Sequence, residues 1–227
     1  MNRKGLAILV APAALILAGC HQHSEHHARQ ASAPAPGGSG STQQVHSELA
    51  SIPTHAENNA GGYTHTPFAH RGKCDTRALL LQQTGQQVRT NKNCTVTSGH
   101  WTDAYSGAPV TSPKAVDIDH MIPLAEAWRS GASRWSPRTW QEFVNDTTNG
   151  ETVVANASLN RAKGDKTPDQ WLPPSPHEVQ CDYTARYIHT QAVWNQRTQS
   201  EGGLSMDPQE KAGIQRALDA CPTTAGR

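Results

Sequence analysis

Four cysteines constrain the fold of this chain more than any other feature of its sequence, because all four follow a short N-terminal export segment. They are Cys74, Cys94, Cys181 and Cys221. An even number of cysteines in an exported chain predicts disulfide bonds, and four cysteines allow three pairings. Pairing neighbours in sequence, Cys74 with Cys94 and Cys181 with Cys221, would brace the two flanks of the segment between them. Zinc binding is the competing use, but none of the four belongs to a C-x-x-C or C-x-x-H pair.

The first twenty residues have the pattern of an export signal. Two basic residues precede an apolar run over residues 6–17, and these 12 residues are fewer than the roughly 20 that span a membrane. Residues 17–20 read Leu-Ala-Gly-Cys, which resembles the lipobox of bacterial lipoproteins. We therefore expect a signal peptide over residues 1–19 and a lipidated Cys20 that anchors an exported protein to a membrane of the cell envelope. An ordinary secretory signal with a secreted product is the alternative.

Residues 20–60 are predicted to be a disordered tether. The segment is rich in Ala, Pro, Gly, Ser, Gln and Asn and has few large apolar residues. A metal-binding tract that includes His21, His23, His26 and His27 is the alternative use of this composition. The folded domain is then expected over residues 61–227.

The net charge limits the kinds of partner that the chain can bind. It has 20 Lys and Arg against 19 Asp and Glu, a formal charge of +1. This excludes a protein that is held on nucleic acid by bulk positive charge. The tether carries one arginine against three glutamates, so the domain is also near neutral. Such a domain can engage one phosphate briefly, but it does not support tight, extended, salt-sensitive binding.

Hydrophobic periodicity predicts short helices and short strands in the domain. We expect helices over residues 75–83, 124–129 and 208–220, and strands over residues 94–99, 116–122 and 152–155. The tryptophans are expected to fill the core. This order of elements predicts an α+β fold.

Two motifs carry residues suited to phosphodiester hydrolysis. Residues 117–124 read Asp-Ile-Asp-His-Met-Ile-Pro-Leu, and residues 160–165 read Asn-Arg-Ala-Lys-Gly-Asp. This reaction needs a base to deprotonate water, and positive charge to stabilise the phosphate and the leaving oxygen.

Each requirement has a candidate residue in these motifs. His120 is the candidate base, because an imidazole accepts a proton near neutral pH. Asp119 and Asn160 offer hard oxygen ligands for Mg²⁺, with Mn²⁺ as the alternative metal. Arg161 and Lys163 are expected to hold a substrate phosphate.

The two motifs together resemble those of the HNH, or ββα-metal, endonucleases. The wider series is similar to that of exported bacterial HNH proteins related to the C-terminal domain of the GmrSD restriction endonucleases, and it covers residues 63–221. The series comprises Cys-Asp-Thr-Arg at 74–77, Ser-Gly-His-Trp at 98–101, Ile-Asp-His-Met-Ile-Pro-Leu-Ala-Glu-Ala-Trp at 118–128, Ser-Gly-Ala at 130–132, Asn-Asp at 145–146, Asn-Arg-Ala-Lys-Gly-Asp at 160–165 and Trp-Leu-Pro-Pro at 171–174.

This resemblance implies a small ββα-metal nuclease core with flanking helices, braced by two disulfides. It implies His120 as the general base, Asp119 as a metal ligand, and Asn160 as a metal ligand or loop-fixing residue. The implied substrate is DNA, with RNA as the alternative, and no obligate protein partner is expected. The chain departs from the pattern because it has no histidine shortly after Asn160, so two protein ligands are expected for the metal. The secondary candidates are Asp117, Glu126 and Ser158, the last at a position where CRISPR-type members have an aspartate.

One geometric condition applies to the proposed pair. Adjacent side chains on a regular strand point to opposite faces, so Asp119 and His120 share one site only at a strand end or a bulge. Pro123, just beyond, favours a strand end. The alternative function is a non-catalytic nucleic-acid-binding or metal-binding lipoprotein that retains the HNH scaffold.

Overall fold

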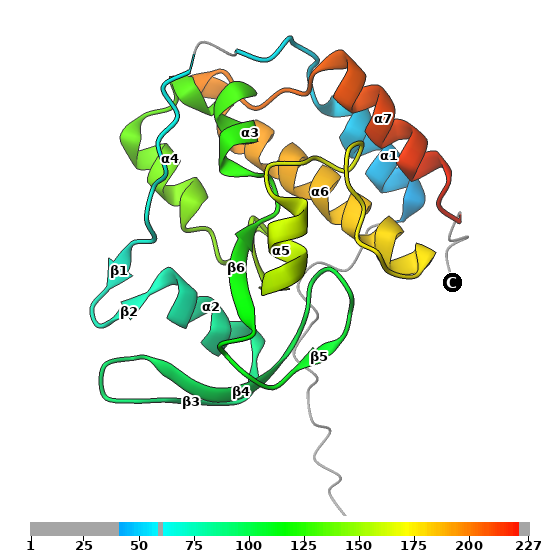
Figure 1. Cartoon of the computed structure of the whole chain (residues 1–227). Coiled ribbons are helices and arrows are strands. Elements are labelled where there is room, and N and C mark those ends of the chain that lie inside the picture. The colour runs from blue at the N-terminus through cyan, green and yellow to red at the C-terminus, as the bar shows by residue number, and fades with distance from the viewer. Residues whose placement is uncertain (1–40, 59–60, 223–227) are drawn as a thin grey trace, which may run out of the picture. The chain divides into compact units, whose positions relative to one another are not determined.

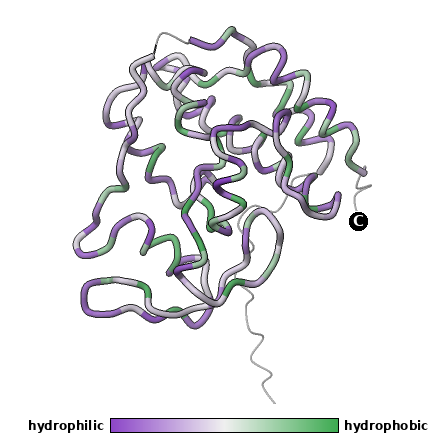
Figure 2. Tube along the Cα trace, in the orientation of Figure 1, coloured by the Kyte–Doolittle hydropathy of each residue, from purple (hydrophilic) through white to green (hydrophobic). Residues whose placement is uncertain are grey.

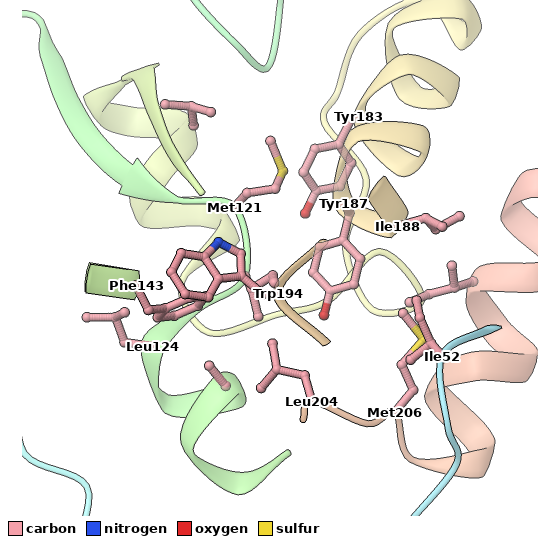
Figure 3. Packing of buried hydrophobic residues seen from close by; sticks show 14 of the residues in the cluster. Ile52, Met121, Leu124, Phe143, Tyr183, Tyr187, Ile188, Trp194, Leu204 and Met206 are labelled. Atoms are coloured by element: carbon pink, nitrogen blue, oxygen red, sulfur yellow. The ribbon is translucent and has the colours of Figure 1, made fainter. Parts of the chain in front are cut away.

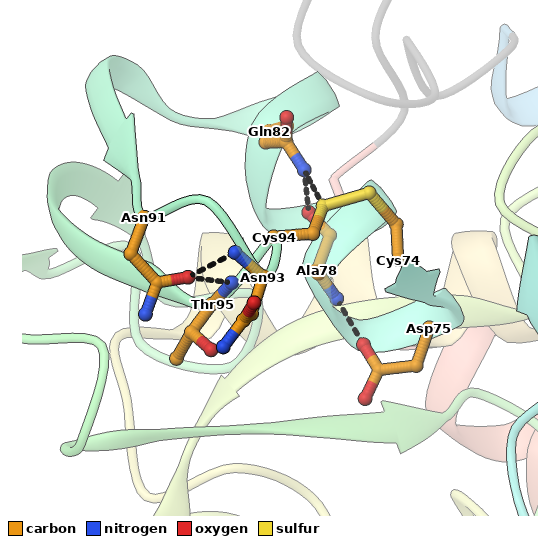
Figure 4. The surroundings of a disulfide bond; sticks show 8 residues. All are labelled: Cys74, Asp75, Ala78, Gln82, Asn91, Asn93, Cys94 and Thr95. Carbon is orange, nitrogen blue, oxygen red and sulfur yellow. Dashed lines mark hydrogen bonds between the residues drawn. A yellow bond between two sulfur atoms is a disulfide. The ribbon is translucent and has the colours of Figure 1, made fainter. Parts of the chain in front are cut away.

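Both disulfides join cysteines that are neighbours in sequence. The computed structural model describes residues 41–58 and 61–222. Cys74 is bonded to Cys94, with their Cα atoms 5.2 Å apart, and Cys181 to Cys221, with their Cα atoms 5.7 Å apart. Figure 4 shows the first disulfide, which ties the start of a helix to the loop that precedes a strand. The predicted pairing is confirmed.

The described residues form seven α-helices and two 3₁₀ helices. Helices α1, α6 and α7 pack against one another, and α6 is the longest of them (Figure 1). The helices are α1 (Thr42–Ser51), α2 (Thr76–Thr84), α3 (Leu124–Arg129), α4 (Pro137–Val144), α5 (Ala157–Lys163), α6 (His177–Arg197) and α7 (Pro208–Asp219), with η1 (Ala132–Arg134) and η2 (Gln199–Glu201). The helix expected over residues 124–129 has the predicted bounds, and those expected near 75–83 and 208–220 are present as α2 and α7.

The described strands form three small antiparallel sheets, in the order β1-β2, β3-β4-β5 and β6-β7. Helix α5 directly follows β7 and contacts both strands of the last sheet. The expected mixture of helices and strands is therefore confirmed. The strands are β1 (His70–Arg71), β2 (Cys74–Asp75), β3 (Gln86–Thr90), β4 (Val96–Thr102), β5 (Pro109–Val110), β6 (Val116–His120) and β7 (Thr152–Asn156).

Aromatic side chains fill the main core, as the sequence predicted. Trp194 of α6 lies against Phe143 of α4, with ring centroids 5.0 Å apart in an edge-to-face arrangement (Figure 3). Trp135 and Trp140 belong to the same cluster. A second buried cluster lies beside the Cys74–Cys94 disulfide and includes Trp101. In Figure 2 the β3–β4 turn is hydrophilic, whereas hydrophobic positions recur along β6.

Helix α1 corrects the prediction of a disordered tether over residues 20–60. Ser41 caps this helix by accepting a hydrogen bond from the Gln44 N–H. Val45 and Leu49, one turn apart, and Ile52 just after the helix are buried in the main core. This segment has few large apolar residues, but they recur at helical spacing. They therefore form one narrow apolar stripe, which is enough to pack α1 against the main core. The signal peptide, Cys20 and the histidine cluster lie outside the described residues.

Helices α4 and α6 have no counterpart among the predicted elements. Helix α6 mixes Gln, Thr, Asp and His with its apolar residues, so its sequence gives only a weak amphipathic signal. Its buried face nevertheless includes polar residues such as Gln191, whose Nε2 donates to the Ser205 carbonyl at 3.0 Å. Among the described residues, no helix combines the length and apolar character needed to cross a membrane.

Candidate active site

Strand β6 presents two carboxylates on the face that α5 covers. Side chains alternate along a strand, so Asp117 and Asp119 share one face, and Val116 and Ile118 share the other. Val116 and Ile118 are buried in the second core cluster, and α5 contacts β6 (Figure 1). The sequence thus places the two carboxylates between strand and helix because the apolar residues occupy the opposite face.

Asp119 is held by three donors and is largely enclosed, with 12% of its side chain exposed. Its Oδ2 accepts from the Tyr105 hydroxyl and lies 3.0 Å from Lys163 Nζ, and its Oδ1 accepts from the His120 N–H at 2.8 Å. Burial and then the neighbouring Asp119 raise the pKa of Tyr105 well above its usual value, so the phenol keeps its proton and donates it. Both oxygens of Asp119 are therefore engaged by protein donors, Oδ2 by two of them and Oδ1 by one.

Lys163 lies in the interior, with none of its side chain exposed. Besides its ion pair with Asp119, its Nζ donates to the His120 carbonyl at 2.9 Å. One ammonium thus fixes both the carboxylate of Asp119 and the backbone at His120.

His120 is the last residue of β6, at the strand end that the sequence predicted. Its Nε2 lies 2.9 Å from the Val144 carbonyl oxygen, and its ring centroid lies 5.5 Å from that of Phe68. Burial, with smaller contributions from Lys163 and His65, lowers the pKa of His120 from 6.5 to about 4, although the Val144 carbonyl and Asp119 oppose this change. The imidazole is therefore neutral near pH 7.

The ladder ends just beyond Met121, because the Ile122 N–H turns to the Glu151 side chain. The Met121 N–H donates to the Glu151 carbonyl at 2.6 Å, and the Ile122 N–H donates to Glu151 Oε2 at 3.2 Å. The strand expected over residues 116–122 therefore stops two residues early. Because the pairing of β6 and β7 is regular up to His120, its imidazole lies on the face opposite Asp119.

The Asn160 side chain bonds to Asp117, and among the described residues no hydrogen bond joins it to Asp119. Asn160 Nδ2 lies 3.3 Å from Asp117 Oδ2. The Asp117 side chain is 41% exposed, and Arg161 Nη1 lies 3.9 Å from the same oxygen, with 71% of the Arg161 side chain exposed. A carboxylate and an amide at an open position suit a hard divalent cation, once the amide turns to present its oxygen.

The predicted ligands Asp119 and Asn160 have different hydrogen-bond partners in the structure. The structure brings Asn160 to Asp117, whereas Asp119 is already bonded to Lys163. The three groups within the described residues that could together hold a metal ion are His177, Cys181 and Cys221, and two of these form a disulfide.

Three further predicted site residues lie elsewhere. Lys163 cannot hold a substrate phosphate, because it is fully buried and its ammonium is already bonded. Glu126 is buried on α3, where it bonds to Arg129 and Ser130, so it does not reach the site. Ser158 is exposed, and its hydroxyl donates to Asn156, the N-cap of α5, so it has a capping role.

Comparison with known proteins places the chain in a family. Residues 62–203 match the family described as GmrSD restriction endonucleases, C-terminal domain. The chain belongs to this family. The matched segment contains Asp117, His120 and Asn160, and membership indicates a nuclease-related function.

A relative of this GmrSD-type domain is known in a fungus. The chain is 32% identical to an uncharacterized secreted protein of Arthroderma benhamiae over 198 residues, which cover 86% of this chain and 93% of that protein. The expectation of a bacterial family is therefore not supported, although the family relation is confirmed. No solved structure matches the chain significantly.

Two residues of the candidate site were missed by sequence reasoning. Tyr105 lies in the loop between β4 and β5, and nothing in its local sequence predicts a bond to Asp119. Glu151 directly precedes β7 and is fully buried, with no partner for its Oε1 among the described residues. Burial raises the pKa of Glu151 well above its usual value, although the Ile122 N–H and Lys163 act to lower it. The carboxyl group is therefore protonated and neutral. The sequence did offer a signal for Glu151, because it is an acidic residue directly beside a hydrophobic strand.

Proposed function

We propose that this chain is a metal-dependent endonuclease that hydrolyses phosphodiester bonds in DNA, or alternatively in RNA, with His120 as the general base. The observation that supports this most is the hydrogen bond between His120 Nε2 and the Val144 carbonyl. A carbonyl only accepts, so Nε2 carries the hydrogen, and in a neutral imidazole Nδ1 then has a free lone pair. Among the described residues, Nδ1 has no competing hydrogen-bond donor.

In the proposed reaction, His120 Nδ1 takes a proton from water while the water oxygen attacks phosphorus and the bond to the leaving oxygen breaks. The lowered pKa of His120 keeps the imidazole uncharged at neutral pH. A bound phosphodiester is negatively charged and favours the imidazolium, so substrate binding raises this pKa and strengthens the base. Lys163 supports the base indirectly, because it holds the His120 carbonyl in place.

Asp117 and Asn160 are the proposed ligands of a divalent cation, Mg²⁺ or Mn²⁺. They are adjacent, they offer oxygen donors, and Asp117 is accessible to solvent. When bound, such a cation would offset the negative charge of a phosphate and of its leaving oxygen. Because the cation lies on the face of β6 opposite the His120 ring, one phosphate meets both groups only around the end of the strand. Arg161, beside Asp117 and exposed, is placed to bind a phosphate oxygen of the substrate. In this proposal β6, β7 and α5 together are the ββα core.

A plasmid-cleavage assay tests the proposed base. The chain without its first 20 residues should convert supercoiled plasmid to nicked and linear forms with Mg²⁺ or Mn²⁺, and EDTA should stop this. His120→Ala should reduce the rate by about 10²–10⁴-fold. His100→Ala is the matched control, because His100 is an exposed histidine on β4, which belongs to a different sheet. Equal cutting by wild type and His120→Ala would refute the assignment.

The same assay separates the two candidate ligand pairs. If Asp117 and Asn160 hold the cation, Asp117→Asn raises the Mg²⁺ concentration for half-maximal rate while the fold is kept, because Asp117 is exposed. Asp119→Asn would act mainly on stability, because Asp119 pairs with buried Lys163. A change in Mg²⁺ dependence caused by Asp119→Asn alone would assign the metal to Asp119 instead.

A non-catalytic binding protein is the second candidate function, and the ligand count favours it. The cation site offers only two protein oxygens, fewer than a closed cation site provides. This reading predicts that the chain binds an oligonucleotide with Mg²⁺ but leaves both the oligonucleotide and plasmid uncut.

We further propose that the chain is exported and that Cys20 is lipidated. The secreted fungal relative supports export. Expression of the full chain with and without Cys20→Ser, followed by separation of membranes, tests the anchor. If both forms distribute equally between membrane and soluble fractions, a secreted product replaces the anchored one.

A further inference from the structure

A polar cavity of about 560 Å³ opens beside the candidate active site. Ligand pockets commonly have volumes of about 300–1,000 Å³. Its wall is built from β1, α2, α4 with the loop over residues 145–149, and the C-terminal end of α6. Figure 1 shows β1, α2 and α4 on the same side of the domain.

Three arginines from three of these elements line the cavity. Arg138 on α4 is paired with Glu142 at 2.9 Å, so its charge is offset. Arg71 on β1 and Arg197 at the end of α6 have no ion pair among the described residues. The guanidinium of Arg197 lies 4.8 Å from the centre of the Trp194 ring, which holds it in place. Two of the three arginines of the cavity therefore have no ion-pair partner among the described residues.

The other acidic residue of the wall, Asp146, forms no ion pair with these arginines. Asp146 is buried, and its Oδ1 accepts from the Thr148 and Asn149 N–H groups while its Oδ2 accepts from Trp194 Nε1. Exposed amides complete the lining, so the cavity offers neutral hydrogen-bonding groups as well as charge. These amides are Gln83 and Gln141.

Two residues contact the proposed base, and the residue that follows each of them in sequence lines the cavity. Val144 accepts the hydrogen bond of His120 Nε2, and the next residue, Asn145, lines the cavity. Phe68 packs against the imidazole of His120, and the next residue, Ala69, also lines the cavity. The Ala69 N–H donates to Asn145 Oδ1 at 2.7 Å, so the two walls are joined. The cavity wall thus begins at the residues that directly follow the two contacts of His120.

We propose that this cavity binds the phosphodiester backbone of the substrate strand on one side of the bond that is cut, with Arg71 and Arg197 as its phosphate contacts. This inference rests on the proposed function, because it takes a polynucleotide as the substrate. It also accounts for substrate binding by a domain with almost no net charge. Two arginines without acidic partners give a local contact that a formal charge of +1 does not reveal.

Binding of a fluorescein-labelled single-stranded oligonucleotide to the His120→Ala chain tests the proposal. His120→Ala serves as the parent so that the strand stays intact, and circular dichroism checks the fold of each variant. Adding Arg71→Ala and Arg197→Ala together should weaken binding about tenfold. The slope of log K against log salt should fall in magnitude by about 1.4, because each phosphate contact on a single strand contributes about 0.7. Arg89→Ala, an exposed arginine on β3 outside the cavity, should change neither quantity.

The outcomes separate this inference from the nuclease assignment. Unchanged affinity and salt slope in the double variant would overturn it, as would an equal loss caused by Arg89→Ala. No binding by the parent would overturn it too. If wild type does not cut plasmid but binding still depends on Arg71 and Arg197, the cavity assignment stands and the nuclease assignment fails.

Discussion

Lys163 and Asp119 form a buried ion pair at the centre of the proposed site, and we expect its disruption to be costly. Replacing Lys163 with Met leaves the Asp119 carboxylate enclosed without its cation. Breaking one side of a buried pair destabilises a protein by about 3–5 kcal/mol. Urea unfolding of Lys163→Met should show a loss of that size.

A double variant distinguishes the ion pair from simple packing. Lys163→Met with Asp119→Asn removes both charges, so it should be more stable than Lys163→Met alone. Lys166→Met, at an exposed lysine just beyond α5, should shift the unfolding free energy by no more than about 0.5 kcal/mol. A double variant as unstable as the sum of the two single ones would indicate that the charges do not interact.

The lowered pKa of His120 predicts an unusual acid limit of activity. The base works only when neutral, so kcat/KM should fall as pH drops through about 4, the pKa in the free protein, and not near 6.5. Steady-state cleavage of a labelled oligonucleotide in buffers spanning this range measures the limit. An acid limb near pH 6.5 that disappears with His120→Ala would show that the imidazole is more solvated than the structure indicates.

At the level of elements, α1 belongs to the folded domain although its sequence resembles a linker. Leu49 is fully buried against the main core, so Leu49→Ala should cost about 2–5 kcal/mol of unfolding free energy. Gln43→Ala, at an exposed position of the same helix, is the control and should be nearly neutral. If the two variants are equally stable in thermal unfolding, residues 41–52 belong to the tether and not to the folded domain.

Elements with a strong local signal were predicted, and elements that depend on distant contacts were not. Helix α7 has Pro208 in its first turn and a capping box, and both are visible in sequence. Helix α6 buries polar residues such as Gln191 and Thr184, so its hydrophobic pattern is weak. It is helical because of the aromatic core around it, which a local pattern does not report.

At the scale of the whole molecule, the buried acidic residues Glu126 and Glu210 should make the free energy of unfolding decrease as pH rises. Burial, and then the nearby Glu126, raise the pKa of Glu210, whose carboxylate accepts from the Tyr187 hydroxyl at 2.9 Å. Above pH 4.5 the unfolded chain loses this proton while the folded chain keeps it, so the free energy of unfolding decreases with rising pH. Glu210→Gln removes the titratable carboxyl group, so the free energy of unfolding should depend less strongly on pH.

Urea unfolding of wild type and Glu210→Gln at several values between pH 5 and 8 measures the effect. Glu142→Gln is a suitable control, because Glu142 is exposed and pairs with exposed Arg138. If the slope against pH is the same for wild type and Glu210→Gln, Glu210 is already ionised in the folded protein.

The sequence alone was enough to predict the mixture of helices and strands and to locate the two motifs that contain His120 and Asn160, and it favoured the disulfide pairing that the structure confirms. These follow from cysteine spacing, local periodicity and residue chemistry, which act over short distances along the chain. Tertiary structure decided that Lys163 is buried and that Asn160 lies against Asp117. These features arise where α5 crosses β6, and a pattern along one segment does not specify which side chains of another segment it meets.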